Sequence, residues 1–143
     1  MLLAAVAAAP VAAEAPKHFE VEATLERAAA PGGGPVVAVR FSALDPDVNV
    51  NEIPAPRLEL DERQTLLSSR AVKTKAATPP MSADEPRYLD LSEPVRFPVA
   101  VSPDAPTGIH GVSADVVYFY CSKRQGWCRR GTAPVTIPIV VSR

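Results

Sequence analysis

Apolar and polar residues alternate along most of the chain, which is the pattern of antiparallel strands with one buried face. In the first run, residues 19–26, Phe19 and every second residue after it are apolar, while glutamates and a threonine occupy the other face. Similar runs predict strands at residues 35–43, 48–50, 57–61, 95–101, 111–121 and 134–141. Residues 63–86 hold no sustained period, so there we predict a ragged strand followed by a long loop.

About seven or eight short strands, with turn-rich segments between them and no helical period, predict an all-β fold. We expect an antiparallel β-sandwich that is immunoglobulin-like in architecture. The strand at 111–121 is apolar on both faces, so it is either central or covered by a loop. Pro98 and Pro138 fall on the polar faces of their strands and predict sheet edges or a bulge. Edges protected by proline favour a monomer.

Length and charge narrow the class of protein. The chain has 143 residues, and residues 18–143 fit a single domain large enough to bury a core without relying on crosslinks. The formal net charge is −1, which points away from nucleic acid and from an anionic membrane surface as partners. Two cysteines form one pair, whose meaning depends on the compartment.

The N-terminal segment, residues 1–13, is apolar and rich in alanine, with Val11 and Ala13 spaced like a signal-peptidase site. No basic residue precedes Lys17, so a disordered alanine-rich tail is the alternative to a signal peptide. We expect the protein to be periplasmic or otherwise exported, where the cysteine pair would rest oxidised. No apolar stretch reaches the ~20 residues that a membrane-spanning helix requires.

Other motifs give little support for a metal or a cofactor. His18 and His110 are the only histidines, and we interpret both as surface residues. No Cys/His cluster with zinc spacing occurs. Acidic and amide residues alternate from Asp45 to Asn51 as in calcium loops, but the glycine and the terminal glutamate of an EF-hand are missing. We predict neither a metal nor a cofactor.

The two cysteines, Cys121 and Cys128, flank a short polar segment that contains Gly126. An alternating aromatic strand precedes them, and a second alternating strand follows shortly after. This order predicts a β-hairpin whose tip is closed by a disulfide, because opposed residues on antiparallel strands bring their Cβ atoms close together. The bond is then either a structural staple or a redox pair.

The residues around the cysteines bear on that choice. Four cations flank the sulfurs and favour thiolate over thiol: Lys123, Arg124, Arg129 and Arg130. Three aromatic residues could provide an apolar docking surface: Trp127, Tyr118 and Tyr120. A staple around a ring of about eight residues would by itself stabilise the fold by roughly 2.5 kcal/mol in the chain-entropy model. Spacing and charge leave both interpretations open.

The segment VSADVVYFYCSKRQGWCRRGTAPVTIPIVV resembles the C-terminal half of the periplasmic N-terminal domain of the thiol:disulfide interchange protein DsbD. In that family a tyrosine-containing strand leads into a cysteine, and a second cysteine follows an aromatic residue. The upstream VNVNEIPAPRLELD is also similar to a segment of relatives. The chain departs from the family at Arg129 and Arg130, where the family pattern has aromatic and proline residues.

The resemblance implies an immunoglobulin-like domain that relays electrons from a membrane reductase to thioredoxin-like thiol–disulfide exchange proteins of the periplasm. It implies that Cys121 and Cys128 are the redox pair and that Cys128 exchanges with partners. The loop that would cap the disulfide corresponds to five residues: Asp84, Glu85, Pro86, Arg87 and Tyr88. Since the sequence holds this domain alone, we expect another polypeptide to supply the electrons. The alternative function is a non-enzymatic binding or structural sandwich whose disulfide only holds the hairpin.

Overall fold

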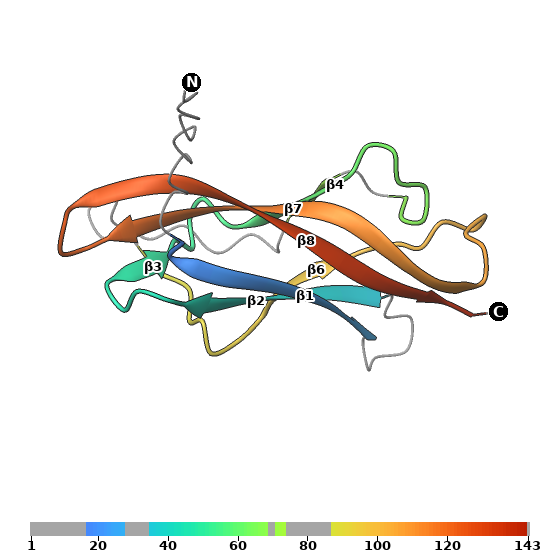
Figure 1. Ribbon diagram of the computed structural model, residues 1–143, viewed down its shortest axis with the longest axis horizontal. Coiled ribbons are helices and arrows are strands. Elements are labelled where there is room, and N and C mark those ends of the chain that lie inside the picture. Colours follow the sequence, from blue (N-terminus) through green and yellow to red (C-terminus); the bar gives the residue numbers. More distant parts are fainter. Residues whose placement is uncertain (1–16, 28–34, 69–70, 74–86, 143) are drawn as a thin grey trace, which may run out of the picture.

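The computed structural model describes residues 17–27, 35–68, 71–73 and 87–142 (Figure 1). These residues form strands and connecting turns, with no helix among them. The strands are β1 (Phe19–Arg27), β2 (Pro35–Ala43), β3 (Val48–Val50), β4 (Arg57–Leu60), β5 (Ala71–Lys73), β6 (Val95–Pro98), β7 (Gly108–Ser122) and β8 (Trp127–Val141).

The strands form two antiparallel sheets. One sheet has the order β1-β2-β6, and its register runs from Phe19 opposite Ala43 to Arg27 opposite Pro35. In the other sheet β7 is central: β8 pairs along one side of it, while β3 and β4 pair end to end along the other side. Figure 1 shows β7 and β8 side by side along the length of the molecule.

The core lies between the two sheets and is built from the apolar positions of the alternating runs. Its largest fully buried side chains include Phe97, Leu58, Ile137 and Ile139, which come from three different strands. β1 of the first sheet also packs beside β8 of the second, so the long hairpin contacts both sheets. The predicted all-β antiparallel sandwich is confirmed.

Several predicted strand boundaries hold, since residues 35–43 and 48–50 are β2 and β3 as expected. β6 is shorter than predicted. It ends at Pro98, and the chain beyond it forms an isolated bridge between Val101 and Leu67. β7 and β8 are longer than predicted, because their pairing continues through polar residues from Gly108 opposite Val141 to Ser122 opposite Trp127.

The two predictions about position within the sheets are confirmed. The strand that is apolar on both faces, β7, is central, and the strands that carry Pro98 and Pro138 lie at sheet edges. Proline lacks an N–H group and therefore fits an edge strand, where one side of the backbone has no pairing partner. Of the predicted long loop, residues 74–86 lie outside the described part of the chain, and β5 falls within the segment where a ragged strand was expected.

Candidate functional site

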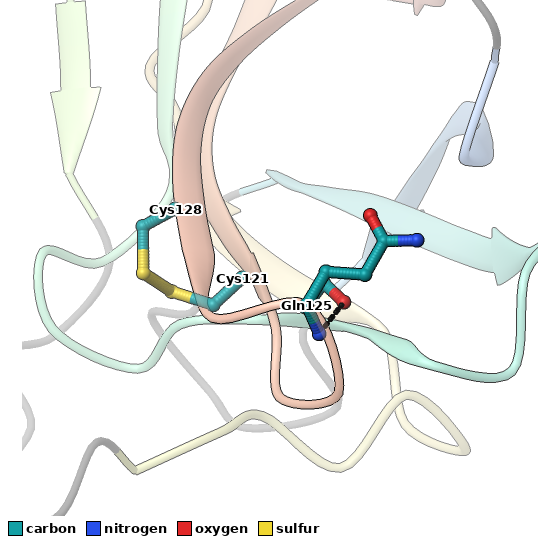
Figure 2. Close-up of a disulfide and its surroundings, with 4 residues drawn as sticks. Cys121, Gln125 and Cys128 are labelled. Carbon is teal, nitrogen blue, oxygen red and sulfur yellow. Dashed lines mark hydrogen bonds between the residues drawn. A yellow bond between two sulfur atoms is a disulfide. The ribbon is translucent and has the colours of Figure 1, made fainter.

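The tip of the β7–β8 hairpin is a four-residue turn between Ser122 and Trp127. Gly126 has a φ of 72°, the left-handed conformation that glycine adopts without steric cost, so the glycine that the sequence placed in this turn is needed there. The Gly126 N–H donates to the Ser122 carbonyl at 2.9 Å, and the Gln125 N–H donates to the Ser122 hydroxyl at 3.2 Å (Figure 2). Ser122 therefore organises the turn.

Cys121 and Cys128 are bonded to each other directly before and after this turn. They are opposed residues of the β7–β8 register, with Cα atoms 4.0 Å apart. The disulfide predicted from the sequence is present, and Figure 2 shows it to one side of the hairpin, with the Gln125 side chain directed away from it. The two halves of the bond differ in access: Cys121 is 3% exposed, whereas Cys128 is exposed.

Side chains alternate along both strands, so the hairpin tip has two faces of different composition. We call the face with the disulfide the outer face; its residues are Phe119, Cys121, Cys128 and Arg130. We call the opposite face the core face; its residues are Tyr118, Tyr120, Trp127 and Arg129. Residues adjacent in sequence, such as Trp127 and Cys128, therefore lie on different faces.

The core face is an aromatic cluster. The Trp127 ring lies 5.7 Å from that of Tyr120 in an edge-on arrangement, and the His18 ring lies 5.5 Å from each of them. Arg129 stacks over Trp127 at 4.2 Å from the ring centroid. Tyr118 is buried, and burial, followed by repulsion from Tyr120, raises the pKa of the Tyr118 phenol.

This arrangement corrects the predicted aromatic docking surface. Tyr118 is 8% exposed and packs against Phe19 and Phe41 in the core, so it offers no surface to a partner. Trp127 and Tyr120 are partly buried against the same core, on the face opposite the disulfide. Sequence proximity to the cysteines suggested a shared surface, but strand alternation separates the rings from the sulfurs.

The four predicted cations are also divided by the fold. Arg129 stacks on Trp127 on the core face, and Lys123 lies over the Tyr88 ring at 4.8 Å. Arg124 lies 3.8 Å from a carboxylate oxygen of Asp47. Only Arg130 both shares the outer face with Cys128 and, among the described residues, has no ion pair or ring partner. The four cations therefore do not gather on the face that carries the sulfurs.

Asp47, from the loop between β2 and β3, contacts the hairpin turn at several points. Its carboxylate accepts hydrogen bonds from the Ser122 hydroxyl and, at 3.2 Å, from the Arg124 N–H. Asp45 holds Asp47 in turn, because the Asp45 carboxylate accepts the Asp47 N–H at 3.0 Å. The sequence indicated only an incomplete calcium loop here. Nothing in that pattern links residue 47 to a turn 75 residues further on.

The end of the predicted cap loop reaches this region. Tyr88 forms a bridge with Asn51 and receives Lys123 over its ring, and Arg87 pairs with Glu52 at 3.2 Å. Asp84, Glu85 and Pro86 lie outside the described residues, so the cap function of that loop remains a prediction.

β3 borders the disulfide on the side opposite β8. Asn49 is opposed to Cys121 in the register, and the Asn51 N–H donates to the Phe119 carbonyl at 2.7 Å. Asn51 is 9% exposed, and its side-chain oxygen is buried without a hydrogen-bond partner. Cys121 thus lies on the central strand between β8 and β3 and is buried, whereas Cys128 lies on the edge strand β8 and is exposed.

The histidines differ from the prediction in one case. The His18 side chain is only 14% exposed, since it packs under Trp127 and Tyr120 with its Nδ1 atom 3.8 Å from an Asp45 oxygen. The prediction of a surface residue is wrong for His18. His110 is partly buried and contacts the Pro106 carbonyl at 2.8 Å.

Neither a metal-binding cluster nor a membrane-spanning helix occurs among the described residues. They contain no group of three or more histidine, cysteine or acidic side chains arranged to hold a metal ion. They also contain no helix of the length and apolar character needed to span a membrane.

Fold and site together define the class of the molecule: an antiparallel β-sandwich with one disulfide at the tip of its longest hairpin, between a buried and an exposed cysteine. Such a bond is compatible with an exported protein. Comparisons of the chain with protein-family models, curated proteins and solved structures found no match.

Proposed function

We propose that the protein is an exported thiol–disulfide exchange domain of the kind found at the N-terminus of DsbD, which relays electrons between a membrane reductase and thioredoxin-like periplasmic proteins. The observation that supports this most directly is the unequal exposure of the pair, with Cys128 open and Cys121 at 3%. An exchange reaction needs one sulfur that a partner can reach and a second that stays close behind it.

The reaction we propose begins with the reductase. A thiolate of the reductase attacks the Cys128 sulfur, the bond to Cys121 breaks, and Cys121 leaves as a thiolate. A second reductase thiolate then attacks the mixed disulfide and releases Cys128. The reductase becomes oxidised by two electrons, and the domain takes up those electrons and two protons as a dithiol.

Delivery of electrons runs the same steps in reverse. The Cys128 thiolate attacks a disulfide of an oxidised partner, and one partner sulfur leaves. Cys121, held opposite Cys128 by the β7–β8 register, attacks the Cys128 sulfur of the mixed disulfide and releases the partner as a dithiol. Arg130 is the one cation of the outer face that can stabilise the negative charge on Cys128.

The surface that we assign to partners is the outer face and its border, not the aromatic core face. It includes the exposed Cys128 and Arg130 and, at the turn, Lys123 above Tyr88. Lys123 links the turn to Tyr88, and the resemblance to the family implies that the segment ending at Tyr88 regulates access to the pair. This part of the proposal rests on the resemblance to the family as well as on that contact.

The reduction potential of the pair tests the proposal. Oxidised protein is equilibrated with graded ratios of reduced to oxidised glutathione and dithiothreitol, and the dithiol fraction is counted after acid quenching and alkylation. We expect a potential within the range of known oxidoreductases, between about −120 and −270 mV. A reduction potential more negative than about −300 mV would contradict the exchange function.

A second candidate function is a binding or structural sandwich whose disulfide is only a staple. The engagement of Arg124, Arg129 and Lys123 by other side chains favours it, because these cations are then less able to stabilise a thiolate. The same titration separates the two functions, since a staple is expected to be the more stable bond.

A further inference from the structure

We propose that Asp47 is a positioning residue for the cysteine pair, and that it makes the pair a stronger reductant by holding the hairpin turn in shape when the disulfide is open. This inference rests on the proposed exchange function. It concerns a loop between β2 and β3 that no part of that function uses.

The contacts form a clamp on the turn that joins the two cysteines. The Asp47 carboxylate bonds the Ser122 hydroxyl and the Arg124 N–H, and it lies 3.8 Å from the Arg124 side chain. Ser122 follows Cys121 directly, is 2% exposed, and accepts the N–H groups of Gln125 and Gly126. The clamp therefore fixes the backbone next to the buried sulfur.

The clamp is itself well supported. The Asp47 side chain is 19% exposed, so water competes weakly for its oxygens. The Asp45 carboxylate accepts the Asp47 N–H at 3.0 Å, and Val48, the next residue, is already paired with Ser122 at the start of β3. A carboxylate held in this way restrains the turn residues that donate to it.

The consequence follows from thermodynamic linkage. The disulfide and the clamp both favour the closed hairpin, so each stabilises the other by the same free energy. When the disulfide is reduced, the clamp keeps the two sulfurs opposed and raises their effective concentration for closing again. A dithiol that closes readily is a strong reductant.

The charge of Asp47 acts in the same direction. The Asp47 carboxylate pairs with Arg124, whose charge would otherwise be free to stabilise the thiolates of the reduced form. Stabilised thiolates make a pair more oxidising. Removing Asp47 therefore makes the potential less negative by both routes.

The experiment compares the equilibrium of the Cys121–Cys128 bond with dithiothreitol across variants of the full chain. We expect Asp47→Ala to lower the equilibrium constant for disulfide formation about tenfold, which is about 30 mV less negative. Ser122 and Arg124 donate to different oxygens of Asp47, so Asp47→Asn keeps an acceptor for only one of them, and its shift should still be smaller than that of Asp47→Ala. A change of less than about twofold in Asp47→Ala would overturn the proposal.

Ser122→Ala provides a second test that leaves every charge in place. It removes the hydroxyl between Asp47 and the Gln125 N–H, and we expect about a threefold fall in the same constant. If the equilibrium constant of Ser122→Ala equals that of the wild type while that of Asp47→Ala differs, the charge of Asp47 acts alone and its positioning role is overturned.

Asp61→Ala is the matched control. The Asp61 carboxylate also accepts a nearby backbone N–H, that of Arg63. However, the Asp61 N–H donates to the Ser113 carbonyl. Ser113 lies about 25 Å from Cys121 along β7, at ~3.3 Å per residue. This control should match the wild type. The reduction potential of the wild type tests the exchange function. The ratio of the variant's equilibrium constant to that of the wild type tests the clamp, so either proposal can fail without the other.

Discussion

The two faces of the hairpin tip are built from neighbouring residues and have different physical character. The core face buries Tyr118 and packs Trp127 and Tyr120 into a continuous aromatic cluster. The outer face carries a disulfide whose second residue, Cys128, is exposed. One face supplies contacts that hold the hairpin, and the other supplies the only group in the tip with redox chemistry.

This difference separates stability from reactivity within one pair of strands. We expect the aromatic cluster to keep β7 and β8 paired when the disulfide opens, because its ring contacts lie on the other face of the hairpin. A disulfide that were the main support of its hairpin would lose its geometry on reduction. We therefore expect large stability effects from changes on the core face and chemical effects from changes on the outer face.

The largest expected effect comes from the core face. Tyr118→Ala should lower the free energy of unfolding by about 3 kcal/mol, because it removes a buried ring and leaves a cavity between the sheets. Arg130→Ala, on the outer face, should change it by less than about 0.5 kcal/mol. Denaturant unfolding of both variants measures the contrast, and equal losses would remove the distinction between the faces.

The disulfide should contribute somewhat less to the free energy of unfolding than the Tyr118 ring. Replacing both Cys121 and Cys128 by serine should lower the free energy of unfolding by about 2.5 kcal/mol, since the crosslink closes a loop of only about eight residues. The folded variant should keep the near-ultraviolet circular dichroism of the packed aromatic rings. Loss of that signal would mean that the bond, not the aromatic cluster, supports the hairpin.

Gly131 sharpens the description of the core face. A Cβ atom at this position would lie 2.5 Å from the Cζ atom of Tyr118, so the ring would have to move. Gly131→Ala should therefore destabilise the fold by about 2 kcal/mol. Gly111→Ala, where the new atom would meet the Thr136 side chain at 3.1 Å, is a control on the same hairpin and should cost less.

Alkaline pH should act on the core face. Burial raises the pKa of the Tyr118 phenol in the folded state, while the unfolded chain ionises near pH 10. Above that pH the unfolded state holds fewer protons than the folded state, so stability should fall as pH rises. Tyr118→Phe should flatten the dependence of the free energy of unfolding on pH, measured by urea titrations between about pH 9 and 11. An unchanged dependence on pH would mean that another group causes it.

The smallest expected effect distinguishes two adjacent arginines. Arg130 shares a face with Cys128, whereas Arg129 stacks on Trp127 on the other face. Arg130→Ala should slow reduction by glutathione about threefold, because it removes a cation near the attacked sulfur. Arg129→Ala should leave that rate unchanged, and equal slowing in both variants would argue for a general charge effect.

Strand periodicity predicted most of the fold. Alternation placed β2 and β3 correctly, and two apolar faces marked β7 as central. The start of β8 was missed because the adjacent polar residues Arg129 and Arg130 interrupt the alternation, although they pair with β7 as regularly as the rest. Where both faces of a hairpin tip are partly exposed, hydrophobic patterning says little about where pairing begins.

The site was predicted only in part. The cysteine pair and Gly126 follow from local sequence, because a turn and a crosslink within a few residues are local features. Asp47 and His18 reach the hairpin from distant parts of the chain, and no spacing rule connects them to it. Grouping Trp127 with the cysteines was wrong because strand alternation places adjacent residues on opposite faces.

The central claim is that exchange occurs at Cys128 while Cys121 stays shielded, and alkylation of the reduced protein tests it most directly. Trypsin cleavage after Lys123, Arg124 and Arg129 puts the two cysteines on separate peptides, so mass spectrometry can follow each one during a short exposure to iodoacetamide. We expect Cys128 to react at least about tenfold faster than Cys121. Equal rates, or faster reaction at Cys121, would contradict the account.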